Sequence, residues 1–350
     1  MRSEDDDPSL LFPEDLLIKL FSWLPVKPLL RFKCLSKRWL DIISSDPHFI
    51  HLHSHQSKSK PPHLFFSSTL PSEVEINKTI LLQSSTDMEG NLLSQFEISK
   101  RDATRRPLML PTRFDLVCLV CNTEIHVCNP STHELITLPP LLFAECNSFG
   151  FGYVESTDEY KIVHLIAPFF DGDLEVYDPI LPTQCSIFTL GMAEDSPSSY
   201  ASPWAWKTIG NSPYNVEHCQ CPAFVDGALH WLINRKRHPE LLIDIEKTIL
   251  AFNLENEEFR LVPRPSGCSD LVCSNLQLVE LKGLLCLSCV DEGVHIMDIW
   301  MPKDYCNETR MFTWVKEYNI DLSTLADTPY GSYSRFLGLL FLGTYMMALI

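Results

Sequence analysis

The sequence predicts an α+β protein arranged by segments, with a small three-helix unit at residues 10–52 and an all-β domain of propeller-like repeats at residues 64–335. Three observations carry this prediction. Apolar residues recur at helical spacing near the N-terminus, short apolar runs bounded by turn residues follow from residue 64, and these runs recur at roughly fifty-residue intervals. A β-sandwich is the alternative architecture for the second part.

The first expected helix carries a wide apolar stripe made by Leu16, Leu17, Leu20, Phe21 and Leu24. Pro13 suits the start of this helix, and Pro25 ends it because the residue before a proline is pushed out of the α region. A second short helix is expected to start near Pro28, and Ser36 is expected to cap a third one.

Three helices in about forty residues cannot enclose so much apolar surface, because domains of this size are marginal on their own. The pattern therefore predicts a docking module that packs Leu16, Leu20, Leu24 and Trp39 against another protein. The alternative is a helical corner of a larger core.

The same stretch resembles the F-box of plant F-box proteins. The matching pieces are Leu24-Pro25-Val26-Lys27, Leu29-Leu30-Arg31-Phe32-Lys33-Cys34, Ser36-Lys37 and Trp39. Phe12 departs from the family, which has leucine before the proline. The resemblance implies a segment that binds the Skp adaptor of a cullin-RING ubiquitin ligase, with adaptor contacts from Pro13, Leu16, Leu17, Leu20, Leu24, Pro25, Leu29, Cys34 and Trp39. The charges of Arg31, Lys33, Lys37 and Arg38 suit either steering toward an acidic adaptor or an ordinary solvated face.

The net charge of −17 is unevenly distributed. Residues 1–60 hold nine Lys/Arg and eight Asp/Glu (+1), which leaves 19 basic and 37 acidic residues (−18) for the rest of the chain. A strongly acidic domain argues against nucleic-acid binding, which needs a basic surface. The N-terminus is acidic and does not resemble a secretory leader, so we expect a cytoplasmic and/or nuclear protein whose 13 cysteines are free thiols.

Residues 53–63 are expected to be a linker, because the stretch around them is polar, lacks apolar periodicity and ends in Pro61-Pro62. The alternating histidines at 51, 53 and 55 are interpreted as solvated, with a metal site as the alternative.

From residue 64 the repeats predict β-hairpins. Asp226-Gly227 and Lys282-Gly283 lie between apolar runs, as hairpin turns do. Two further stretches repeat the same spacing, in which an asparagine (129 or 253) precedes a glutamate by five residues and a proline by ten. Trp231 is expected to fill the core, and His230 to face a neighbouring strand.

Residues 115–300 also resemble the associated domain that follows the F-box in many plant F-box proteins. The resemblance rests on short pieces in the same order, such as Phe149-Gly150-Phe151-Gly152-Tyr153, Asp158-Glu159-Tyr160-Lys161-Ile162-Val163 and Phe224-Val225-Asp226-Gly227-Ala228-Leu229-His230-Trp231. It implies a non-catalytic substrate-recognition subunit of a Skp-cullin-F-box ligase, which recruits an unknown target protein for ubiquitination. The alternatives are an adaptor-bound scaffold acting outside ubiquitination, and an enzyme or small-ligand binder on a propeller-like domain.

The cysteine pairs 118/121 and 286/289 have the spacing of zinc ligands. Residues three apart in a strand point to opposite faces, so we interpret these cysteines as buried apolar residues and expect neither a metal nor a cofactor. A further zinc candidate is the set His218, Cys219 and Cys221, which is expected in a loop before Pro222.

Residues 336–350 form an apolar tail of fifteen residues, which is short of the twenty or so that a membrane helix needs. We interpret this tail as an altered or truncated terminus that leaves the last strands of the domain incomplete. A C-terminal membrane anchor is the alternative.

Overall fold

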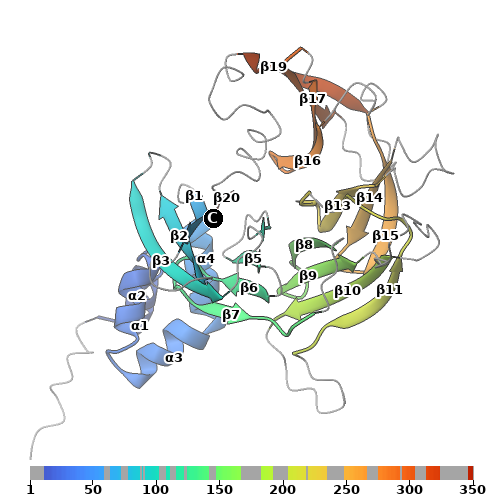
Figure 1. The fold of residues 1–350 in the computed structure, drawn as a ribbon. Coiled ribbons are helices and arrows are strands. Elements are labelled where there is room, and N and C mark those ends of the chain that lie inside the picture. Colours follow the sequence, from blue (N-terminus) through green and yellow to red (C-terminus); the bar gives the residue numbers. More distant parts are fainter. Residues whose placement is uncertain are drawn as a thin grey trace, which may run out of the picture.

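The computed structural model consists of four helices followed by strands arranged around a common centre (Figure 1). It describes residues 12–58, 64–71, 78–86, 89, 91–101, 108–110, 116–121, 124–141, 147–166, 183–191, 204–217, 220–234, 248–265, 275–291, 294–303, 313–323 and 346–349.

The helices are α1 (Glu14–Phe21), α2 (Val26–Phe32), α3 (Lys37–Ser45) and α4 (Pro47–Lys58). Pro13 precedes α1, whose first turn holds two acidic residues that suit the helix dipole. Pro25 precedes α2, so this helix begins two residues earlier than expected. Ser36 caps α3 by accepting a hydrogen bond from the Trp39 backbone N–H at 3.2 Å, as the sequence predicts.

Helix α4 corrects the predicted linker, because residues 53–58 are helical. Asp46 starts the helix by accepting a hydrogen bond from the Phe49 backbone N–H at 3.1 Å. Phe49 is buried, and a ring nitrogen of His53 lies 3.1 Å from the Leu24 carbonyl oxygen. Tertiary packing therefore stabilises a segment whose polar sequence favours a loop. Residues 59–63 lie outside the described part of the chain.

The strands form five four-stranded antiparallel sheets, as a propeller-like domain requires, so the β-sandwich alternative is wrong. The first sheet contains β20 (Met346–Leu349), β1 (Leu64–Pro71), β2 (Lys78–Thr86) and β3 (Leu92–Arg101). The second contains β4 (Leu108–Met109), β5 (Val117–Cys121), β6 (Glu124–Cys128) and β7 (Leu135–Thr137). The third contains β8 (Asn147–Val154), β9 (Glu159–Ile166), β10 (Thr183–Leu190) and β11 (Lys207–Ser212).

The fourth sheet contains β12 (Ala223–Val225), β13 (Ala228–Leu232), β14 (Thr248–Asn253) and β15 (Glu258–Pro263). The fifth contains β16 (Asn275–Leu281), β17 (Leu284–Asp291), β18 (Ile296–Pro302) and β19 (Trp314–Asp321). In Figure 1 the last strand of each of these sheets lies on the outside of the ring.

The apolar tail contributes a strand to the first sheet, which corrects the prediction of missing last strands. Strand β20 pairs antiparallel with β1, with Leu349 opposite Leu64, and it contacts β4 of the second sheet. The two ends of the domain are thus hydrogen-bonded to each other. The remaining tail residues, 336–345 and 350, lie outside the described residues.

Apolar side chains join consecutive sheets. One core lies between the second and third sheets, another between the third and fourth, and another between the fourth and fifth. Trp231 lies in the second of these cores and donates a hydrogen bond from Nε1 to Ser148 Oγ at 2.9 Å. His230 is buried and faces the carbonyl oxygen of Ala223 on the neighbouring strand, so both predictions for this pair are confirmed.

The predicted hairpins are confirmed. Asp226 and Gly227 both have positive φ angles, and so do Lys282 and Gly283, as the right-twisted two-residue turn requires. In the repeated stretches, the side-chain oxygen of Asn129 accepts hydrogen bonds from the backbone N–H groups two and three residues further along the chain, and that of Asn253 does the same.

The prolines that end these repeats have a shared role. The indole of Trp206 donates to the Pro139 carbonyl at 3.0 Å, and that of Trp314 donates to the Pro263 carbonyl at 2.9 Å. The second bond joins β15 to β19, and the first joins the residues that flank the outer strands β7 and β11.

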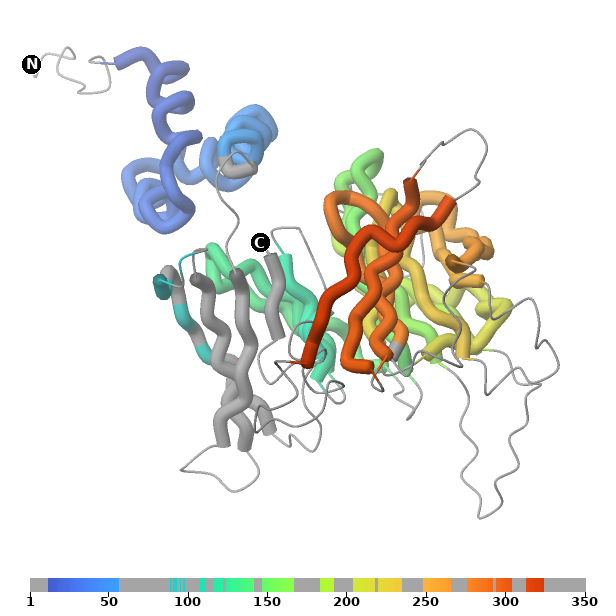
Figure 2. Tube along the Cα trace, turned by 90° about the horizontal axis from the view of Figure 1, so that it is seen from above, coloured from blue at the N-terminus to red at the C-terminus, as the bar shows by residue number. Residues whose placement is uncertain are grey.

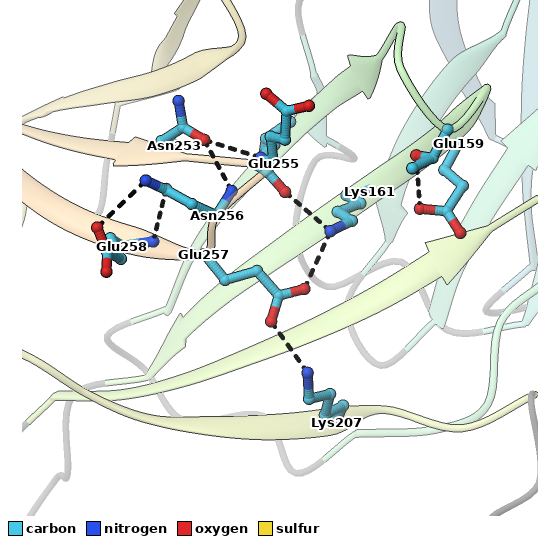
Figure 3. Close-up of polar contacts among 10 residues, drawn as sticks. Glu159, Lys161, Lys207, Asn253, Glu255, Asn256, Glu257 and Glu258 are labelled. Atoms are coloured by element: carbon cyan, nitrogen blue, oxygen red, sulfur yellow. Dashed lines mark hydrogen bonds and ion pairs between the residues drawn. The ribbon is translucent and has the colours of Figure 1, made fainter. Parts of the chain in front are cut away.

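A buried lysine also joins the third and fourth sheets (Figure 3). Lys161 Nζ donates to the Leu254 carbonyl at 2.8 Å and to Glu257 Oε1 at 3.0 Å, and Lys207 Nζ lies 3.0 Å from Glu257 Oε2. Partial burial opposes the charge of Glu257, but its hydrogen bonds to the two lysines hold its pKa below the usual value. The charge of Lys161 is therefore compensated inside the domain.

Strand β8 packs closely against the fourth sheet because Gly152 has no side chain. A Cβ atom there would lie 2.5 Å from carbon atoms of Phe224 and Leu254. We expect Gly152→Ala to lower the free energy of unfolding by about 1–3 kcal/mol in urea denaturation, because overpacking forces neighbours to move. Gly191→Ala is the control, since the three atoms nearest to its Cβ, the first at 2.9 Å, all belong to the flexible Glu159 side chain, which can move aside. Equal stability of both variants would contradict this packing.

Two buried histidines make the β-domain sensitive to acid. Burial lowers the pKa of His164 to about 4 from 6.5, and burial with the nearby Arg260 charge lowers the pKa of His230 to about 4. Between pH 4 and 6.5 the unfolded chain binds more protons than the folded chain. The free energy of unfolding therefore decreases as the pH falls from about 6.5 to 4, by at most about 3 kcal/mol per histidine. Chemical denaturation at several pH values in this range gives the free energy of unfolding at each pH. This free energy should fall less steeply with decreasing pH for His164→Gln than for wild type. An unchanged slope would refute this contribution of His164.

Candidate protein-docking surface

The helices enclose a small core of their own. Leu29, Ile42, Ile43 and Phe49 are buried, and aromatic rings pack beside them, with ring centroids 4.8 Å apart for Phe21–Phe32 and 4.7 Å for Phe21–Trp39. Arg38 of α3 forms an ion pair with Glu14 at the start of α1. Figure 2 shows the helices as a separate unit on one side of the sheets.

Helix α1 has a second apolar face that points away from this core. Ile18 and Phe21 pack inward, whereas Leu16 is 44%, Leu20 54% and Trp23 59% exposed. Leu16 and Leu20 are four positions apart, so they share one side of the helix, and Trp23 follows in the turn after α1, where its backbone N–H donates to the Leu20 carbonyl at 3.3 Å. Large apolar side chains in water on one helix side mark an interaction surface.

The surplus of exposed apolar side chains is concentrated in the helical unit. Of the fifteen large exposed apolar residues in the described part of the chain, seven lie within residues 12–50. They are Phe12, Leu16, Leu20, Trp23, Leu35, Leu40 and Ile50, and we call them the exposed helical set. Among the residues whose exposure is described, the helical unit thus holds more exposed large apolar side chains per residue than the rest of the chain.

The predicted adaptor residues fall into three groups. Five are exposed, namely Pro13, Leu16, Leu20, Pro25 and Cys34. Three are half-buried, namely Leu17, Leu24 and Trp39, and the last two of these also pack against the helical core. Leu29 is only 4% exposed, so its place is in the core rather than on the surface.

Sequence reasoning missed five residues of the exposed helical set: Phe12, Trp23, Leu35, Leu40 and Ile50. Trp23 follows Leu16 and Leu20 at helical spacing, so extending the stripe by one turn would have found it. The basic residues Arg31, Lys37 and Arg38 are exposed and Lys33 is half-buried, which leaves both interpretations of their charge open.

The proposed zinc ligands lie in apolar surroundings. Cys118 and Cys121 are both buried in β5, and burial raises the pKa of the Cys118 thiol well above its usual value. Burial raises the pKa of Cys286 to about 11. Among the described residues, no group of three or more His, Cys, Asp or Glu side chains is placed to hold a metal ion, and His218 and Cys219 lie outside those residues.

Cys289 corrects the expectation that all thiols are free, because it is disulfide-bonded. Separately, no helix in the described part of the chain is long and apolar enough to cross a membrane.

Two family models match the chain in the order of its two parts. The F-box domain matches residues 9–51, and the F-box associated beta propeller domain matches residues 115–338. The chain belongs to the plant F-box proteins with an associated β-propeller domain. The exposed helical set therefore lies on an F-box, and the five sheets include the associated domain.

Several proteins of Arabidopsis thaliana are similar over most of the chain. F-box protein At3g07870 is 26% identical over 328 residues, which cover 88% of this chain and 72% of that protein. F-box protein At5g10340 is 25% identical, with 92% and 72% covered, and F-box protein CPR1 is 25% identical, with 88% and 74% covered.

Solved structures are only distantly similar. An oligogalacturonate lyase in complex with manganese has a TM-score of 0.41 and 12% identity, with 70% of this chain and 62% of that chain covered. An apocarotenoid oxygenase of Synechocystis has a TM-score of 0.40 and 12% identity, with 74% and 62% covered. Similarities of this size say nothing about the activity of this F-box protein.

A leucine-to-alanine substitution should have a large effect on stability in the core of the F-box and a small effect on its exposed face. Leu29→Ala should lower the free energy of unfolding by about 2–5 kcal/mol, because it removes a buried side chain. Leu20→Ala should change it by less than about 0.5 kcal/mol, because Leu20 is exposed. Thermal unfolding followed by circular dichroism measures both. Equal losses would show that Leu20 also belongs to the core.

Proposed function

We propose that this protein is a substrate-recognition subunit of a Skp-cullin-F-box ubiquitin ligase. Its F-box docks a Skp-type adaptor, which connects the chain to a cullin, and its β-propeller domain recruits a target protein. The observation that carries the proposal is the apolar surface of α1 and the turn after it, where Leu16, Leu20 and Trp23 are exposed on a domain that has its own core.

The energetics of this face fit a stable complex. Each half-exposed leucine or tryptophan contributes about 1 kcal/mol or more when a partner covers it. Buried aromatic and aliphatic anchors of this kind dominate the affinity of protein interfaces. Pro13, Leu17, Pro25 and Cys34 surround these anchors in sequence and complete the proposed contact. Leu29 contributes indirectly, by holding the helices in place.

The proposed mechanism is proximity. A protein that binds the adaptor at one site and a target at another raises the local concentration of the target near the ubiquitin carrier. Bond chemistry then belongs to other subunits, and this chain is non-catalytic with no cofactor. The seven free thiols among the described residues suit a reducing compartment, the cytoplasm or the nucleus.

Adaptor binding is tested by co-expression with a Skp-type adaptor and affinity purification. The double variant Leu16→Asp, Leu20→Asp should lose co-purification by at least about a hundredfold, because two carboxylates would have to be desolvated at the interface. The matched control is Leu261→Asp, which places a carboxylate at a leucine of similar exposure, 45%, in the propeller domain. It should bind the adaptor like wild type.

Equal adaptor binding by the double variant and wild type would refute the assigned surface. Addition of a cullin to the purified complex separates ligase from scaffold. A complex of all three proteins supports the ligase, whereas adaptor binding that excludes the cullin supports the adaptor-bound scaffold instead.

A further inference from the structure

The outer strands of the five sheets differ in how they are protected. Strands β3, β11, β15 and β19 each carry at least one Lys, Arg, Asp or Glu, whereas β7 reads Leu135-Ile136-Thr137 and carries none. Charged residues on an edge strand normally prevent pairing with another chain. Strand β7 lacks this protection, and all three of its residues are exposed.

The hydrogen bonds of β7 show which backbone groups face outward. The Asn129 N–H donates to the Glu134 carbonyl at 2.9 Å, and the Leu138 N–H donates to the Ile125 carbonyl at 2.9 Å. Residues 134, 136 and 138 therefore hydrogen-bond to β6, because bonding alternates along an antiparallel strand. The N–H and C=O groups of Leu135 and Thr137 point to the open edge, since β7 is the last strand of its sheet.

The surroundings of this edge are acidic. Glu134 precedes the strand, and Glu124, which is half exposed, lies near its other end, because the adjacent Ile125 bonds to Leu138. The described residues of this sheet and its turns, at 108–110, 116–121 and 124–141, contain no Lys or Arg. Ile136 is 39% exposed, so a partner segment that pairs with this edge should place an apolar side chain beside it. The residues next to that apolar residue in the partner segment should be basic.

We propose that the β7 edge is the target-docking site, and that its occupant is an extended segment of the target protein with an apolar residue flanked by Lys or Arg. The segment adds to the second sheet as a fifth strand, bonding to the outward groups of Leu135 and Thr137, and its basic side chains approach Glu124 and Glu134. This inference names the target chemistry for the proposed receptor function and rests on it.

The test uses the full-length chain and a phage-displayed library of random nine-residue peptides. Wild type should enrich peptides in which β-branched or aromatic residues alternate with Lys or Arg. Thr137→Pro removes one outward N–H and keeps the backbone bonds to β6, so it should weaken binding of a synthesised enriched peptide by at least about tenfold. It also removes the 2.9 Å side-chain bond of Thr137 to His126 of β6, a loss that Thr137→Val shares. Thr137→Val keeps that N–H and is the matched control, which should bind like wild type.

Amide hydrogen exchange gives a second readout that does not depend on a variant. When the enriched peptide binds, exchange at Leu135 and Thr137 should slow, while Ile136, already bonded to β6, should change little. Failure to enrich such peptides, equal binding by Thr137→Pro and wild type, or protection elsewhere on the domain would each overturn the proposal.

The outcomes for the two surfaces are independent. Thr137→Pro should still co-purify with the Skp-type adaptor, and the Leu16→Asp, Leu20→Asp variant should still bind the peptide. Wild type that binds the enriched peptide but no Skp-type adaptor would refute only the F-box assignment, and wild type that binds the adaptor but enriches no such peptide would refute only the β7 assignment.

Discussion

Apolar side chains of this protein are buried only where one secondary-structure element packs on another. The F-box and the propeller differ in how much of their apolar surface is buried in this way. Within the propeller, sheets stack through shared cores, so apolar residues on their facing sides are covered. The F-box is too small to do the same. Its core takes Leu29 and Phe49, and the outward side of α1 remains exposed. The proposed docking follows from this geometric limit.

The propeller adds polar joints to its apolar cores. Lys161 joins the third and fourth sheets through Glu257, and indole-to-carbonyl bonds at Pro139 and Pro263 join outer strands or the residues that flank them. Strand β20 completes the first sheet with the other end of the domain. Sheets fixed in this way present outer strands in stable positions, as a surface that holds a target requires.

Local signals in the sequence predicted much of this architecture. Pro13 and Ser36 at helix starts, the Asp-Gly turn and the repeated asparagines all act on neighbouring residues, and all were identified correctly, whereas the helix expected near Pro28 begins at Val26. Helix α4 was missed because contacts such as that of His53 with Leu24 come from elsewhere in the fold. Strand β20 was missed for the same reason, since it pairs with β1 across the whole domain. At the docking surface, spacing identified the stripe on α1 but could not tell that Leu29 faces the core.

The most direct measurement is amide hydrogen exchange of the full-length chain with and without a purified Skp-type adaptor. We expect the adaptor to slow exchange within residues 12–50, around the exposed helical set, and to leave exchange in the five sheets unchanged. Slowed exchange confined to the sheets, or no change anywhere at saturating adaptor, would contradict the division of the chain into an adaptor-docking F-box and a separate target-binding domain.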